Sequence, residues 1–115
     1  MLFRSNPDAR GAAYNLGAEL LGQGRTEEAI RYLYQALGQQ PDSFPVRTNL
    51  GIALATLGQR EEAREQLEEA LRLGPSSSFA HNNLGAVLYE LGRYREALPH
   101  FEEALRLDQI GRAHV

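Results

Sequence analysis

The chain has 115 residues, of which 43% are hydrophobic and 23% charged, a composition typical of one small folded domain or a few short repeats. Twelve basic and 15 acidic side chains give a net charge of −3, which argues against a nucleic-acid binder because such proteins usually carry a basic excess. Cysteine is absent, so disulfides, thiolate metal sites and cysteine nucleophiles are excluded, and no apolar run is long enough to span a bilayer.

The basic residues are all arginine, and lysine is absent. Arginine, alanine, glycine and leucine are largely encoded by GC-rich codons, so we expect a GC-rich, bacterial source. No apolar signal-peptide segment follows Met1. From this start we expect a cytoplasmic protein.

One motif recurs three times along the chain at a constant spacing. An Asn-Leu-Gly triplet occupies residues 15–17, 49–51 and 83–85, and a glycine follows seven residues after each triplet, at Gly24, Gly58 and Gly92. This period predicts tandem units over residues 10–43, 44–77 and 78–109, without insertions.

Each unit predicts two helices separated by its glycine. In the first helix, leucines four residues apart, such as Leu50 and Leu54, form one apolar face. In the second helix, alanine, a large apolar residue and alanine follow at i, i+4 and i+7. A glycine inside a helix costs about 1 kcal/mol, so the repeated Gly51 position indicates close helix packing.

The expected helix ends are marked by serine and proline. Ser43 can cap the first helix of the second unit, and Ser76 or Ser77 that of the third. Pro45 falls in a first turn, where proline is tolerated, whereas Pro99 lies inside the last helix and predicts a local bend.

The period, the Leu-Gly pair, the small and large residues of the second helix and the prolines that end the first two units, Pro41 and Pro75, resemble the tetratricopeptide repeat (TPR) family. The chain departs at the fourth place of each unit, where Ala13, Arg47 and His81 replace a frequent tryptophan. The resemblance implies an all-α fold, a right-handed α-solenoid of three tandem 34-residue helix-turn-helix repeats. It also implies that the first helices line a concave groove and that neighbouring repeats bury each other's apolar faces.

Both ends of the chain differ from the repeat pattern. Residues 1–9 are in register with it, since Pro7 precedes Pro41 by one full period, so we expect the tail of a preceding repeat or a leader. Residues 110–115 resemble a translated sequencing adapter, and we expect a non-native tail there. The third unit then ends early, the chain is a fragment of a longer protein, and the helix faces of Leu98, Phe101, Leu105 and Leu107 stay partly uncovered.

Asparagine recurs at one place that the resemblance assigns to the groove, at Asn15, Asn49 and Asn83. A carboxamide both donates and accepts hydrogen bonds, so three of them can hold the main chain of an extended peptide. The alternative is that asparagine is frequent here without a bound peptide. The predicted peptide-binding residues are Asn15, Asn49, Asn83, Tyr14, Thr48, Asn82, Ile52, Phe79 and Tyr89.

The aromatic members of this set have two interpretations. Tyr14, Phe79 and Tyr89 either anchor a ligand beside the asparagines or pack between repeats. Within the groove-facing places only Glu90 is charged, which favours an extended ligand that is mostly uncharged or mildly basic.

The repeats that clamp the acidic C-termini of heat-shock chaperones use lysine, arginine and asparagine at five places. Here those places hold Tyr14, Ala18, Asn49, Phe79 and Asn83. Because no cation is present to pair with carboxylates, the clamp is predicted to be absent.

Catalysis has no support in the sequence. His81 and His100 lack ligand-like spacing to carboxylates and are interpreted as structural, and the serines 76–78 as turn residues. We therefore predict no catalytic residue, metal or cofactor, and a scaffold that binds a protein or extended peptide. Two alternatives are a substrate-docking arm of a larger enzyme, such as a glycosyltransferase, and a self-association module using the last helix.

Overall fold

The computed structural model describes residues 11–113, and within this range it contains helices and no strand. The prediction of a leader or repeat tail over residues 1–9 lies outside the described part. The elements are α1 (Ala12–Gly22), α2 (Thr26–Gln39), α3 (Phe44–Thr56), α4 (Arg60–Leu73), α5 (Ser78–Glu90) and α6 (Tyr94–Ala113).

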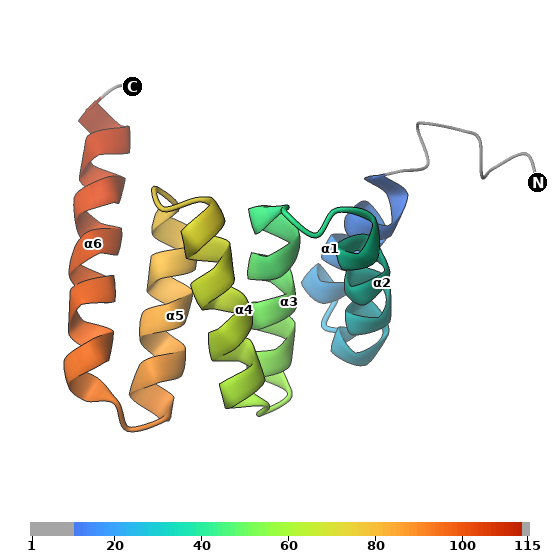
Figure 1. The fold of residues 1–115 in the computed structure, drawn as a ribbon, viewed down its shortest axis with the longest axis horizontal. Helices are drawn as coiled ribbons and strands as arrows, with labels where there is room; N and C mark the ends of the chain where they lie inside the picture. Colours follow the sequence, from blue (N-terminus) through green and yellow to red (C-terminus); the bar gives the residue numbers. More distant parts are fainter. Residues whose placement is uncertain (1–10, 114–115) are drawn as a thin grey trace, which may run out of the picture.

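The helices pack in chain order as antiparallel pairs, α1 with α2, α3 with α4 and α5 with α6 (Figure 1). Successive pairs are joined by contacts of α2 with α3 and of α4 with α5. The result is an elongated molecule of 50 × 35 × 24 Å, with α6 at one end and α1 and α2 at the other. The predicted all-α solenoid of helix-turn-helix repeats is confirmed. No helix of the described range is long and apolar enough to cross a membrane.

The turn within each pair has the same geometry. Gly24, Gly58 and Gly92 have φ values of +80°, +82° and +79°, a left-handed conformation that favours glycine. In the second pair the amides of Gly58 and Gln59 donate to the carbonyls of Ala55 and Leu54, which satisfies the end of α3. Glycine at this place therefore ends the first helix of each pair.

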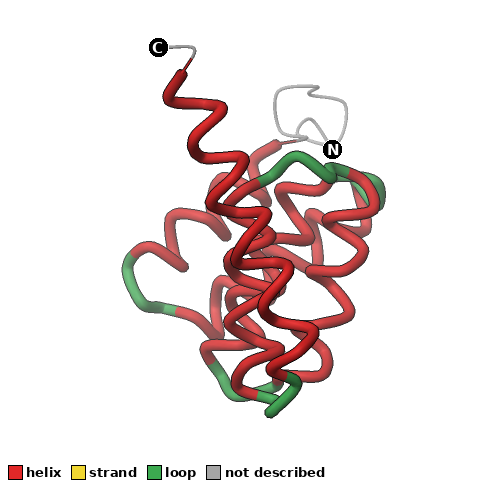
Figure 2. Tube along the Cα trace, turned by 90° about the vertical axis from the view of Figure 1, so that its left-hand side faces the viewer, coloured by secondary structure: helices red, strands yellow, loops and turns green. Residues whose placement is uncertain are grey.

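The predicted caps are present at two of the first helices. The hydroxyl of Ser43 accepts a hydrogen bond from the Val46 amide at 3.3 Å, and that of Ser77 accepts one from the Ala80 amide at 3.1 Å. Pro45 lies in the first turn of α3, as expected. Pro99 lies inside α6, which is one uninterrupted helix leading towards the C-terminus (Figure 2).

The core consists of a main cluster of leucine, alanine and valine side chains that extends over all six helices, and a smaller cluster of Ala13, Ala36 and Val46. Leu33, Leu50, Leu67 and Leu84 are at most 1% exposed. A Cβ added at Gly51 would lie 2.6 Å from Cγ of Leu67, so the predicted close packing at this glycine is confirmed.

The two end helices keep apolar side chains exposed. Leu16 of α1 is 42% exposed, although the sequence pattern places it on the core face with Leu20. On α6, Leu98 and Leu105 are 57% and 65% exposed, while Phe101 and Leu107 are half-buried, so the expected uncovered face is present.

Candidate functional site

The predicted peptide-binding residues lie on α1, α3 and α5, the first helix of each pair. These helices form a row in which α3 contacts both α1 and α5. Each of them carries a single Asp, Glu, Lys or Arg, namely Glu19, Arg47 and Glu90. By contrast, the second helix α4 alone has eight, so the three first helices present the weakly charged side of the molecule.

The three asparagines are accessible at the same place on successive first helices. Asn15 is exposed, and Asn49 and Asn83 are half-buried. Nδ2 of Asn83 donates to the carbonyl of Phe79 at 2.8 Å, one turn earlier in α5. Its Oδ1 and its second N–H remain as hydrogen-bonding groups. The structure thus brings the predicted asparagines onto a row of neighbouring helices.

The three aromatic candidates have different surroundings. Tyr14 is half-buried and packs against the core residues Ala13, Ala36 and Val46, as the packing interpretation expects. Phe79 and Tyr89 are 58% and 59% exposed, which leaves them accessible to a ligand. The ring of Tyr89 meets that of Tyr94 edge to face, with the ring centres 4.9 Å apart.

Thr48 was predicted to contact a peptide at the surface, but it is buried. It is only 4% exposed, and its hydroxyl donates to the carbonyl of Phe44 at 2.8 Å. Asn82, which holds the same place in the next helix pair, is exposed, and Ile52 is half-buried. Because Thr48 is buried where another helix pair follows, its place belongs to the packing between pairs.

The charge of Glu90, the one charged candidate in the predicted groove, is partly offset. Its carboxylate lies 3.7 Å from Nε of Arg60, and both side chains are about half exposed. Such exposed pairs contribute little to stability, but they lower the local net charge. The row of first helices is therefore close to neutral along its length.

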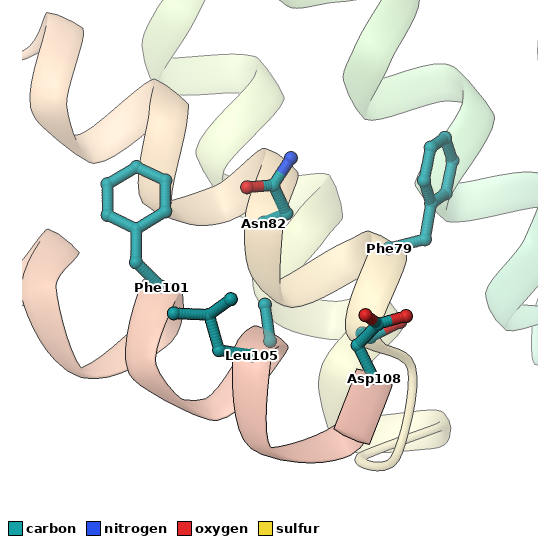
Figure 3. A pocket seen from close by; sticks show the side chains of 7 residues that line it. Phe79, Asn82, Phe101, Leu105 and Asp108 are labelled. Atoms are coloured by element: carbon teal, nitrogen blue, oxygen red, sulfur yellow. The ribbon is translucent and has the colours of Figure 1, made fainter. Parts of the chain in front are cut away.

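A pocket of about 470 Å³ lies between α5 and α6. Figure 3 shows Phe79 and Asn82 on α5, with Phe101, Leu105 and Asp108 on α6. Ser78 and Ala104 complete the lining. Sequence reasoning missed Ala104 and Asp108 here because only the packing of α6 on α5 brings them beside Phe79, and it interpreted Ser78 as a turn residue.

The structure also pairs the two histidines, which the sequence did not relate. Nδ1 of His81 lies 3.0 Å from Nδ1 of His100, and Nε2 of His81 lies 3.0 Å from the carbonyl of Pro75. Arg47 makes the equivalent contacts, because its guanidinium donates to Gln66 and to the carbonyl of Pro41, each at 3.0 Å. The equal sequence spacing of the two pairs was the available signal.

One member of the histidine pair has a shifted pKa. The pKa of His100 is lowered, chiefly by burial and then by the neighbouring His81, against the opposite effect of Glu68 and Glu96. Within the described range no group of three or more His, Asp or Glu side chains is arranged to hold a metal ion. The contact between His81 and His100 joins α5 to α6.

Comparison with known proteins identifies the family. Residues 20–86 match one tetratricopeptide repeat model and residues 78–109 match another. The chain belongs to the tetratricopeptide repeat family.

Solved structures of the same fold are similar to the chain. A structure of MamA MSR-1 is 31% identical with a TM-score of 0.80, over 94% of this chain and 62% of the MamA chain. MamA AMB-1 is 34% identical with a TM-score of 0.80, over 90% of this chain and 61% of its own. The chain thus spans about three fifths of the length of these MamA chains.

A third structure shows the fold alone. The second TPR of Spaghetti (RPAP3), bound to the HSP90 peptide SRMEEVD, is 23% identical with a TM-score of 0.83, over 93% of this chain and 99% of its own. No curated protein matched the chain in sequence. Membership of the tetratricopeptide repeat family supports a role in protein–protein interaction.

Proposed function

We propose that the row formed by α1, α3 and α5 binds an extended peptide segment of a partner protein. The observation that carries the proposal is an asparagine at one place on three adjacent helices. Each carboxamide would donate to a main-chain carbonyl of the ligand and accept from a main-chain N–H. Ile52, Phe79 and Tyr89 add apolar contacts beside Asn49 and Asn83, whereas the buried Thr48 takes no part.

The ligand chemistry follows from the weak charge of this row. Recognition through the main chain tolerates many side chains, and the paired Glu90 leaves little net attraction for a charged ligand. We therefore expect extended, mostly uncharged segments. An acidic peptide finds no cluster of cations here, so SRMEEVD, the ligand of the Spaghetti (RPAP3) structure, serves as a negative control.

The proposal is tested by binding a peptide library to the wild type and to the triple variant Asn15→Ala/Asn49→Ala/Asn83→Ala. A net hydrogen bond contributes about 0.5–1.5 kcal/mol, so loss of three should weaken the selected peptides at least about tenfold. The matched control removes three exposed carboxamides from second helices, in Gln35→Ala/Gln39→Ala/Gln109→Ala, and should bind like the wild type.

A second arm tests whether the ligand's main chain is recognised. N-methylation of the selected peptide removes its main-chain donors and should weaken binding to the wild type but change little in the triple variant. If the triple variant binds as well as the wild type, or if SRMEEVD binds best, the asparagine proposal is wrong.

The role as a substrate-docking arm of a larger enzyme uses the same residues and remains an alternative. The complete reading frame around this segment distinguishes the two, because a nucleotide-sugar domain beside the repeats would favour the enzyme. Cytoplasmic location remains a prediction from the sequence.

A further inference from the structure

The contact between His81 of α5 and His100 of α6 brings two imidazole nitrogens close together. Their Nδ1 atoms are 3.0 Å apart, while the ring centres are 5.3 Å apart and the ring planes are tilted by 31°. The two nitrogens therefore lie between the rings. The helices α5 and α6 run side by side (Figure 1), and both histidines are half-buried, so each ring keeps contact with solvent.

The other helix pairs hold different side chains at these two places. In the second pair, Arg47 donates to Gln66 at 3.0 Å. In the first pair, the two places hold Ala13 and Tyr32. A hydrogen bond between the helices of a pair therefore does not require histidine. Two imidazoles add a property that the other pairs lack, since each can present a nitrogen lone pair to a metal ion.

The carbonyl of Pro75 defines which nitrogen of His81 carries the proton. Nε2 of His81 lies 3.0 Å from this oxygen. Because a carbonyl only accepts hydrogen bonds, Nε2 is the donor, and Nδ1 of the neutral ring keeps its lone pair on the side of His100. Histidines that bind metals commonly donate their other N–H to a backbone carbonyl, which holds the ring in place. His81 therefore already has the arrangement of a metal ligand.

The distance between the two nitrogens indicates the kind of ion. Imidazole nitrogens bind first-row divalent ions at about 2.0–2.1 Å, so an ion shared by nitrogens 3.0 Å apart has an N–metal–N angle of about 95°. Neighbouring ligands in square-planar or tetragonal coordination, which is typical of Cu²⁺ and Ni²⁺, are separated by about this angle. Tetrahedral Zn²⁺ would require a larger separation of about 3.4 Å. The ion lies beside the line that joins the nitrogens, so each ring turns towards it.

Three carboxylates lie near the rings but are already paired. Glu68 and Glu96 act electrostatically on His100, and Glu103 is close enough to His81 to interact with it in the same way. Each of the three accepts hydrogen bonds from a nearby arginine. The protein therefore supplies two nitrogen ligands, and water completes the coordination of the ion.

We propose that His81 and His100 together bind one divalent transition-metal ion, Cu²⁺ or Ni²⁺, through their Nδ1 atoms. The ion replaces the hydrogen bond between the rings. The proton of His100 leaves Nδ1 and a proton from water binds at Nε2 of the same ring, so both imidazoles stay neutral. Two protein ligands hold an ion less tightly than the four of a structural zinc site, and we expect a Kd of about 1–100 μM.

The experiment titrates Ni²⁺, and separately Cu²⁺, into the full chain after a chelator has removed bound metal. Isothermal titration calorimetry from about 1 μM to about 1 mM metal covers the expected affinity. The wild type should bind one ion per chain. Its melting temperature should rise with the Ni²⁺ concentration, because the two ligands come together only when α5 packs on α6. Mg²⁺ is the control ion, since it prefers oxygen ligands and should not bind to the pair.

Two variants assign the binding to the pair. His81→Arg/His100→Gln places the side chains of the Arg47–Gln66 contact in the third pair, which removes both imidazoles and keeps a bond between the helices. Its affinity for Ni²⁺ should fall at least about tenfold, and Ni²⁺ should no longer raise its melting temperature. His114→Gln is the matched control, because it removes the third histidine of the chain, and it should bind like the wild type.

Four results overturn the proposal. The first is a double variant that binds Ni²⁺ and Cu²⁺ as tightly as the wild type, which would leave the two histidines as a hydrogen-bonded contact alone. The second is loss of binding in His114→Gln, which would move the site to that histidine. The third is Mg²⁺ that binds as tightly as Ni²⁺, which would indicate carboxylate ligands. The fourth is one ion per two chains, which would mean that the ligands come from different copies.

Discussion

At the scale of single residues, the fourth place of the repeat shows what the sequence could predict and what it could not. The replacement of an apolar residue by Arg47 or His81 predicted side chains that are only partly buried, and both are half-buried. Their partners Gln66 and His100 were missed. A contact between the two helices of a pair depends on how the second helix is rotated against the first, which the spacing of apolar residues does not define closely enough.

Replacement of Gly51 by alanine tests the close approach of α3 and α4. The new methyl would lie 2.6 Å from Cγ of Leu67, whose side chain is fully buried. Overpacking of this kind costs about 1–3 kcal/mol, against a gain in helix propensity of up to about 1 kcal/mol. We expect Gly51→Ala to lower the free energy of unfolding in urea by roughly 1–2 kcal/mol.

Gly38 supplies the control for this experiment. It also lies inside a helix, but a Cβ added there meets no atom within 4 Å. Gly38→Ala should therefore stabilise the protein by about 0.5–1 kcal/mol. Equal effects of the two substitutions would mean that the helices are not in close contact at Gly51.

The histidine pair makes stability depend on pH. Because the pKa of His100 is lowered in the folded protein, the neutral form is favoured there. The contribution of His100 to stability is complete above its pKa in the unfolded state, about 6.5. It is lost as the pH falls through that value towards the lower pKa of His100 in the folded state. We expect the free energy of unfolding to decrease between about pH 7 and pH 5.

The double substitution His81→Arg/His100→Gln isolates this effect. It transfers the side chains of the Arg47–Gln66 pair, which do not titrate in this range, to α5 and α6. Urea titrations at several pH values should show a smaller decrease for this variant than for the wild type. The pKa values of Glu28, Glu69 and Glu96 are lowered by arginine neighbours, so their contribution is lost below about pH 4.5, outside this window. If the free energy of unfolding depended on pH equally in both proteins, the assignment of this effect to His100 would be wrong.

At the scale of helices, periodicity and turn residues predicted the elements well. The left-handed glycines end α1, α3 and α5, and Ser43 and Ser77 cap α3 and α5. The exposure of single side chains was harder to predict, because it depends on whether another helix pair packs against the helix that carries them. Leu16 has the pattern of a core residue and is exposed, while Thr48 was expected at the surface and is buried.

One substitution at two equivalent places tests this dependence on neighbours. Leu71 on α4 is covered by α5, whereas Leu105 occupies the same place on α6 and is 65% exposed. Leu71→Arg places a charge in the interface and should cost about 3 kcal/mol or more, while Leu105→Arg should change stability by less than about 0.5 kcal/mol. Urea denaturation measures both, and a large loss in Leu105→Arg would show that its face is covered in solution.

At the scale of the whole molecule, the constant period of the sequence predicted the architecture, because each helix pair contacts its neighbours in the same way. The candidate site follows less directly. The asparagines fall on one row of helices because they share a place in the repeat. The sequence also predicted the uncovered face of α6, but the pocket brings Phe79 and Asn82 of α5 beside that face, which depends on how the two helices pack and not on residue spacing alone.

Removal of residues 110–115 tests their contribution to the fold. Ile110 is 44% exposed, and the guanidinium of Arg112 lies 3.1 Å from the carboxylate of Asp108 in an exposed pair. Since exposed pairs contribute little, we expect the melting temperature to change by less than about 3 °C. A larger drop would show that the segment packs in solution. Resequencing of the locus tests its origin, and a genomic stop codon directly after Val115 would refute the adapter interpretation.

The linear packing of the helix pairs has a mechanical consequence. In the described range, the principal helix contacts join helices of the same pair or of adjacent pairs, so a force that pulls the ends apart loads the interfaces one after another. No interface is shielded by distant contacts, and each can yield separately. The molecule should therefore extend under small forces, through small changes at several interfaces, before any single helix unwinds.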